Sequence, residues 1–207
     1  MFSPYSKTMQ IIGRITDLIL LNILFLITSL PLFTIGASAS ALYTMCFRLM
    51  REEYSGIIKP YFRAFRANFR QSTAAWLVLL LLILPTVFYF DRLFQTEGPL
   101  RYAGLVFFLI LVLGLMTASY VFPWISQFQN TTKQSLLNAL ILSISHLPRT
   151  VCILVIHLLP AALWVFQYEL FLNVSFLWIA LYFAAAAYMA TGLLWHVFKP
   201  YRQNQTN

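Results

Sequence analysis

Long runs without a charged side chain most limit how this chain can fold. Residues 76–90, WLVLLLLILPTVFYF, form one such run, and several others approach the roughly 20 apolar residues that a helix needs to cross a bilayer. Only 10% of the 207 residues are charged, against about 25% in a typical soluble domain. A transmembrane barrel would instead alternate apolar and polar residues along each strand. The sequence therefore predicts an all-α, polytopic transmembrane helical bundle, with residues 1–207 as a single domain.

The stretch LPLFTIGASASALY at 30–43 decides how many spans there are. Pro31 cannot donate a backbone hydrogen bond and Gly36 adopts backbone angles that other residues avoid, so we expect a tight turn here. Thr34 or Ser38 would then cap a returning helix. The alternative is one kinked span followed by an interfacial helix, which gives five spans. With the returning helix the predicted spans are six: 13–30, 34–53, 74–90, 102–122, 150–166 and 174–197.

The distribution of basic residues favours six spans over five. With six, twelve Lys and Arg lie inside and only Arg92 and Arg101 lie outside. With five, the N-terminus moves outside and the ratio falls to ten against four. Because inside loops of membrane proteins are enriched in Lys and Arg, the first arrangement is preferred. We therefore expect a multi-pass protein whose N- and C-termini are both cytoplasmic.

Small and turn-forming residues gather around the predicted second span. Small side chains let helix backbones approach closely in lipid, where no hydrophobic effect drives association. A serine on this face is also expected to donate a hydrogen bond to a neighbouring helix. The candidate helix-packing residues are Pro31, Thr34, Gly36, Ser38 and Ser40.

Two segments are typical of amphipathic helices at the cytoplasmic face. In 59–72, Arg63, Arg66 and Arg70 share a helical face next to a face of aromatic residues. We expect this helix to lie in the membrane surface, with its arginines toward anionic lipid headgroups. The alternative is a docking helix for a cytoplasmic partner. Because the basic residues flank apolar spans, the net charge of +8 indicates anionic lipid and not nucleic acid.

The second segment, 131–150, also has an apolar helical face. It aligns with the first at an offset of 75 residues, and each is followed by an apolar hairpin. The pattern is compatible with a duplicated unit of surface helix plus hairpin, over 57–124 and 132–199.

Two polar residues lie well inside predicted spans, Asn22 and His157. A charged imidazolium would be costly there, so we expect His157 to be neutral and hydrogen-bonded to a neighbouring helix. The competing hypothesis is a direct functional role, since ionisable residues in membranes often mark transport paths. For Asn22 we favour an interhelical hydrogen bond over ligand binding.

The sequence lacks the usual patterns of catalytic and cofactor sites. It has no Gly-rich phosphate loop and no cluster of His, Cys, Asp or Glu with metal-ligand spacing. No Ser, Cys or Asp has a recognisable partner base. We therefore expect no enzymatic activity, no catalytic residue, no metal and no cofactor.

Residues 21–53, LNILFLITSLPLFTIGASASALYTMCFRLMREE, followed by GIIKPYFRAFRANFRQS at 56–72, resemble the YesL-like family of bacterial integral membrane proteins. Members of that family are encoded beside carbohydrate ABC importers, and no function is assigned to the family. The resemblance implies the bacterial cytoplasmic (inner) membrane and a role in sugar uptake by association only. It carries over no binding or catalytic residue.

Two functions are compatible with these observations. The first is a non-enzymatic membrane accessory protein of a carbohydrate ABC importer, with the importer's subunits as partners. The second is an independent small-molecule carrier or flippase. A carrier requires a polar path, for which the spans offer few side chains: Asn22, Ser38, Ser40, Thr117, Ser119, His157 and Thr191.

Overall fold

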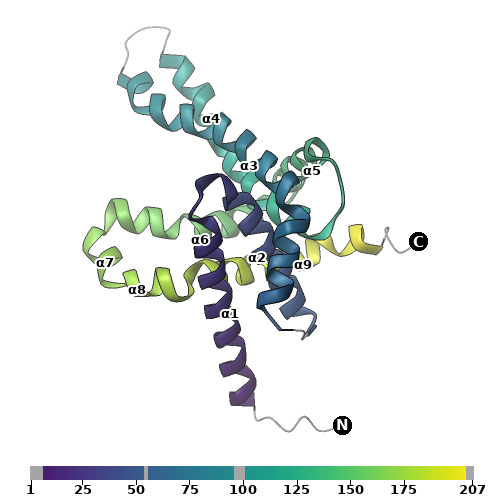
Figure 1. The fold of residues 1–207 in the computed structure, drawn as a ribbon. Coiled ribbons are helices and arrows are strands. Elements are labelled where there is room, and N and C mark those ends of the chain that lie inside the picture. Colours follow the sequence, from purple (N-terminus) through teal and green to yellow (C-terminus); the bar gives the residue numbers. More distant parts are fainter. Residues whose placement is uncertain (1–6, 54–55, 96–100, 204–207) are drawn as a thin grey trace.

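The computed structural model describes residues 7–53, 56–95 and 101–203 (Figure 1). Within these ranges the chain forms helices and short connections, with no β-strand. The longer helices are α1 (Lys7–Ser29), α2 (Ile35–Met50), α3 (Ile58–Gln95), α4 (Arg101–Gln127), α5 (Thr132–Ser145), α6 (Leu147–Phe166) and α9 (Phe183–Gln203). Shorter pieces are the 3₁₀ turn η1 (Leu32–Thr34), α7 (Tyr168–Asn173), α8 (Ser175–Leu177) and the π-helical segment η2 (Trp178–Tyr182).

Six helical stretches of the described chain are long and apolar enough to cross a membrane. This confirms the predicted all-α polytopic class, and the returning helix on which the sixth span depends is among them. The six are Ile11–Ser29, Leu32–Met50, Ile58–Val87, Gly104–Ile125, Leu147–Phe166 and Ser175–Arg202.

The residues after α1 form the predicted turn, but the predicted cap is absent. The backbone N–H of Thr34 donates to the carbonyl of Pro31 at 2.8 Å. The Thr34 hydroxyl lies 2.6 Å from the carbonyls of Thr28 and Pro31, so it points back toward α1 and does not cap α2. Ser38 lies inside α2 and donates to the carbonyl of Thr34 at 3.1 Å. The capping expectation is therefore wrong, and Thr34 instead satisfies free carbonyls of the preceding turn.

The third span begins earlier than predicted. Residues 59–72 are helical, but they are continuous with the span in one helix of 38 residues. The expectation of a separate surface helix is wrong because residues 61–84 contain neither glycine nor proline to interrupt the backbone hydrogen bonds. At 1.5 Å per residue, α3 is about 57 Å long, nearly twice the thickness of a hydrocarbon core.

The first half of α3 packs beside α2 and reaches the α1–α2 turn. The hydroxyls of Tyr61 and Thr28 lie 2.8 Å apart. The indole N–H of Trp76 donates to the carbonyl of Leu32 at 2.8 Å. The turn therefore meets α3 midway along its length, near the point where α3 changes from basic to apolar.

The second predicted surface segment does break from its span. Thr131 and Gln134 form a capping box at the start of α5, and α5 ends before His146. Pro148 is the second residue of α6, a position that tolerates the missing N–H. The two aligned segments thus differ in form, one continuous and one broken, and the duplicated unit stays a hypothesis.

The enclosed centre of the bundle surrounds α2. Of the α2 window, 67% is buried, against 11–39% in the other five spans. The largest fully buried side chains include Phe47 of α2, Tyr61 of α3, Tyr120 of α4 and Phe198 of α9. From this centre the far ends of α3 and α4 extend in one direction, and the hairpin from α6 to α9 extends in another (Figure 1).

Charged ends of several helices meet at one place. Arg14 of α1 pairs with Glu52 at 3.2 Å, just after α2. Arg51 donates to the side-chain oxygen of Gln127 at the end of α4. The guanidinium of Arg202, near the end of α9, lies 4.4 Å from the centre of the Trp195 ring. The structure therefore brings together helix ends that the charge distribution assigned to one side of the membrane.

Candidate functional site

The small-residue face of α2 makes a very close helix contact. A Cβ on Gly36 would lie 2.7 Å from Cβ of Trp76 and 3.0 Å from the ring of Phe122, and it would clash with the carbonyl oxygen of Ser72. Because a backbone oxygen cannot move aside as a flexible side chain can, the approach of α2 to α3 requires glycine here. Pro31, by contrast, is exposed and shapes the turn without packing into the centre.

The two candidate serines pack in this contact but do not bond across it. Ser38 and Ser40 are fully buried. Ser38 donates to Thr34 and Ser40 donates to the carbonyl of Ala37 at 3.0 Å, so both hydroxyls serve their own helix. The expectation that a serine here donates to a neighbouring helix is therefore wrong. Their contribution to the contact is their small size, which lets the helices approach closely.

Asn22 joins α1 to the π-helical segment. Its side chain is fully buried. The amide nitrogen donates to the carbonyl of Ile179 at 2.6 Å, and the amide oxygen accepts from the backbone N–H of Ala184 at 2.9 Å. These two backbone groups are five residues apart, and in a regular π-helix a carbonyl and an N–H at this spacing are hydrogen-bonded to each other. The Asn22 amide thus stands between the two, and the predicted interhelical role of Asn22 is confirmed.

His157 hydrogen-bonds a neighbouring helix, as predicted. Its Nδ1 lies 2.8 Å from the carbonyl of Ile153, and because a carbonyl only accepts, Nδ1 carries the hydrogen. Its Nε2 lies 3.0 Å from the hydroxyl of Tyr43 on α2, so Nε2 accepts from that hydroxyl. Both ring nitrogens of a neutral imidazole are satisfied in this tautomer.

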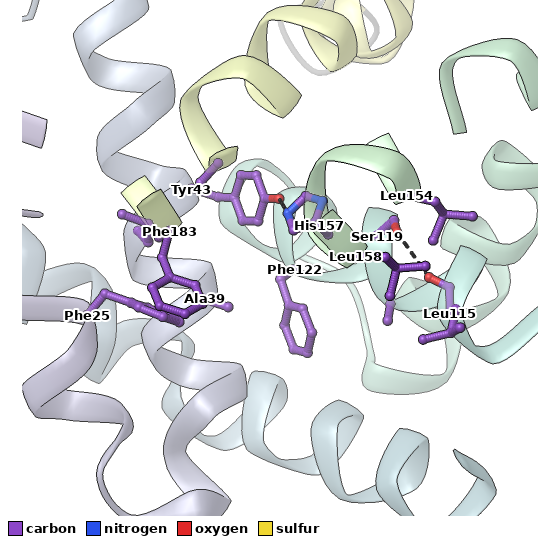
Figure 2. A pocket seen from close by; sticks show the side chains of 13 residues that line it. Phe25, Ala39, Tyr43, Leu115, Ser119, Phe122, Leu154, His157, Leu158 and Phe183 are labelled. Carbon is purple, nitrogen blue, oxygen red and sulfur yellow. Dashed lines mark hydrogen bonds between the residues drawn. The ribbon is translucent and has the colours of Figure 1, made fainter. Parts of the chain in front are cut away.

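The Tyr43–His157 pair lies on the wall of a cavity of about 210 Å³ (Figure 2). Five helices form the walls, with Phe25 from α1, Phe122 from α4 and Phe183 from α9 among the lining residues. Tyr43 is almost fully buried, whereas His157 as a whole residue is exposed. The cavity therefore opens on the outer surface of the bundle beside α6.

The hydroxyls considered for a polar path are engaged within their own helices. Ser119 lines the cavity, and it donates to the carbonyl of Leu115 at 3.0 Å (Figure 2). Thr117 donates to Leu113 and Thr191 donates to Ala187, both at 2.7 Å. With Ser38 and Ser40 bonded in the same way, these five hydroxyls keep their hydrogens inside their own helices.

The three arginines of α3 form an exposed basic face. Arg63, Arg66 and Arg70 are all exposed and follow one another at helical spacing. None of them is in an ion pair with another described residue. Their charge is therefore available to a ligand outside the chain.

The acidic, cysteine and histidine side chains of the described ranges do not form a group that could hold a metal. Cys46 is buried, Cys152 is exposed, and both are free thiols.

Sequence reasoning missed the partners of the polar residues. Tyr43 is 114 residues from His157, and Ile179 is 157 residues from Asn22. A polar residue in an apolar span signals that a partner is needed, but the sequence spacing does not say which residue it is. The cavity likewise depends on five helices whose arrangement no local pattern specifies.

Comparison with known families gives one match. The model of a family described as "Protein of unknown function, DUF624" matches residues 18–92. The matched part runs from the middle of α1 through α2 and most of α3, so it includes Asn22, the α1–α2 turn and the three arginines. The chain is similar over this part to a family without an assigned function. Neither the curated proteins nor the solved structures gave a match.

Proposed function

We propose that this chain is a non-enzymatic accessory protein of the bacterial cytoplasmic membrane that docks a partner on the basic face of α3. The partners proposed are subunits of a carbohydrate ABC importer, a choice supported by the likeness of residues 21–72 to the YesL-like family. The N- and C-termini are proposed to face the cytoplasm, on the twelve-to-two distribution of basic residues.

The observation that carries the proposal is the exposed, unpaired face of Arg63, Arg66 and Arg70. This face belongs to a helix half that packs beside α2, a helix long and apolar enough to span a membrane. Charge beside spanning helices is costly in hydrocarbon and is stabilised by counter-charge or water. Arginine also forms bidentate hydrogen bonds with carboxylates, so an acidic surface on a partner suits the face.

Anionic lipid is the competing ligand of the same three arginines. A helix lying flat in the surface would place all three among the headgroups. In the continuous helix, Arg63 precedes Arg70 by seven residues, a rise of about 10 Å along the axis. We therefore propose that lipid headgroups contact Arg70, nearest the apolar half, and that Arg63 and Arg66 are left for a protein.

A co-purification experiment tests the docking role. The chain would be captured in mild detergent from cells that express the importer, and the bound subunits would be quantified. Removing Arg63, Arg66 and Arg70 together should abolish capture, while replacing all three with lysine should reduce it. A matched control removes three exposed charges elsewhere, at Lys133, Arg149 and Lys199, and should leave capture unchanged. Equal capture by the variant without the three α3 arginines and by the control variant would refute the proposed docking role.

The carrier or flippase is the second candidate, and the five-helix cavity is the observation in its favour. The hydroxyls that would line a polar path are engaged within their own helices, which favours the accessory role for polar solutes such as sugars. Uptake of a labelled sugar by the purified chain alone in liposomes would favour the carrier instead.

A further inference from the structure

We propose that the five-helix cavity binds one acyl chain of a membrane phospholipid. This inference is independent of the docking role proposed above. It rests on the chemistry of the cavity wall, on the surface where the cavity opens, and on its volume.

The wall has no hydrogen-bond donor to offer a ligand. Only Tyr43, Ser119 and His157 bring polar side-chain atoms to it. Their hydrogens are already donated, by Tyr43 to Nε2 of His157, by Ser119 to Leu115 and by Nδ1 of His157 to Ile153. A polar or charged solute would lose its hydrogen bonds to water here without replacement, at a cost of several kcal/mol. The wall therefore selects hydrocarbon.

The cavity opens among exposed apolar side chains. Leu158 on α6 is 40% exposed and Phe183 on α9 is 37% exposed, and both line the cavity. Both residues belong to helices long and apolar enough to span a membrane, so the medium at the opening is the hydrocarbon interior of the bilayer. Phospholipid acyl chains are the hydrocarbon present there at the highest concentration.

The volume suits part of a chain and not a whole lipid. A cavity of about 150 Å³ in another protein takes up benzene, and this one measures about 210 Å³. A chain end enters through the opening beside His157, while the glycerol and headgroup remain outside in the bilayer. The phenyl rings of Phe25, Phe122 and Phe183 then flank the chain (Figure 2).

Photo-crosslinking tests this assignment. The protein would be placed, at one copy per nanodisc, in phosphatidylcholine carrying a diazirine near the end of one acyl chain, and the labelled residues would be mapped by mass spectrometry. Phe122 is 6% exposed and Val155, outside the cavity on α6, is 62% exposed. Labelling by surface contact alone would give Phe122 about one tenth of the label at Val155, the ratio of 6 to 62. A chain inside the cavity predicts a ratio well above this value.

A cavity-filling variant provides the control. Ala118→Leu should cause loss of the Phe122 label with no change at Val155, because Ala118 lines the cavity. Ala39→Leu fills the cavity from α2 and serves if the first variant does not fold. Ala162→Leu makes the same change on the exposed face of α6 and should alter neither label.

Three results would overturn the proposal. One is a ratio of about one tenth in the unaltered protein, and another is a Phe122 label that persists in a folded cavity-filling variant. The third is a Phe122 label that disappears when several copies share a vesicle, because a second copy would then cover the opening.

Discussion

Replacing Asn22 should destabilise the protein more than replacing any other asparagine of the described residues. Asn22→Leu keeps the number of non-hydrogen side-chain atoms and their branching but removes both hydrogen bonds of the amide. The carbonyl of Ile179 and the N–H of Ala184 then lose their partner inside the bundle. Each buried backbone group left unpaired costs about 1–3 kcal/mol, and measured side-chain hydrogen bonds in a membrane protein average about 0.6 kcal/mol. For the two bonds together we expect a loss of about 1–6 kcal/mol, from twice the measured average to twice the upper cost of an unpaired group.

A loss of stability near the lower end of that range would mean that the two backbone groups bond to each other once the Asn22 amide is removed. Ile179 and Ala184 are five residues apart, so the N–H of Ala184 can turn to the carbonyl of Ile179 and close a π-helical bond directly. That closure requires the backbone to move into the space of the lost amide. Asn22→Asp is informative here, because a buried carboxyl in an apolar span is expected to be protonated, and it then keeps an acceptor for Ala184 and a donor for Ile179. It should therefore cost less stability than Asn22→Leu.

The assay has a global and a local readout. Thermal unfolding in detergent, followed by tryptophan fluorescence, reports the global loss. Hydrogen exchange at the amide of Ala184 reports the local one, and it should accelerate in Asn22→Leu and stay slow in Asn22→Asp. Asn138→Leu is the matched control, since Asn138 is half-buried on α5 and its side chain makes no hydrogen bond in the described structure. Unchanged melting together with unchanged exchange at Ala184 in Asn22→Leu would refute the reasoning.

Three further predictions concern single contacts. Gly36→Ala should cost about 1–3 kcal/mol by forcing α2 from α3, whereas Gly192→Ala, with nothing within 4 Å of the new Cβ, should be neutral or stabilising in the same melting assay. His157→Leu should cost on the order of 1 kcal/mol and His157→Gln less; a double-mutant cycle of His157→Leu with Tyr43→Phe should show coupling, and additive effects would mean that the bond between them contributes nothing. A cysteine at Phe33, in a background without the two native cysteines, should react with an impermeant reagent from outside the cell; protection of Phe33 in a folded protein would contradict the predicted orientation.

Composition was sufficient for the fold class, because a helix that spans lipid must be long and apolar. The spans near 13–30, 102–122 and 150–166 follow this rule closely. The continuity of α3 over 61–84 was also predictable, since this stretch lacks the glycine and proline that would interrupt a helix. The separate surface helix was expected from the arginine and aromatic faces of 59–72, and such faces indicate the surroundings of a helix and not where it ends.

The contacts of the candidate site could not be predicted from the sequence in the same way. Small residues after Gly36 indicated a close packing face, and the structure places Ser38 and Ser40 in it. Yet Ala39, between them, lines the cavity instead, since successive helical residues point in different directions. Which neighbour each face meets depends on the crossing of α2 with α3 and α4, and that crossing is a property of the whole bundle.

The continuity of α3 affects which arginines should be counted as inside charges. The count of twelve against two included Arg63, Arg66 and Arg70 as charges of an inside segment. In the structure they lie on a helix beside α2, so they can be removed from the count. Twelve minus three leaves nine against two for six spans, and ten minus three leaves seven against four for five. The preference for six spans survives, so the orientation does not depend on these three arginines. A charge beside spanning helices needs counter-charge or water, and the proposed acidic partner surface would supply the counter-charge.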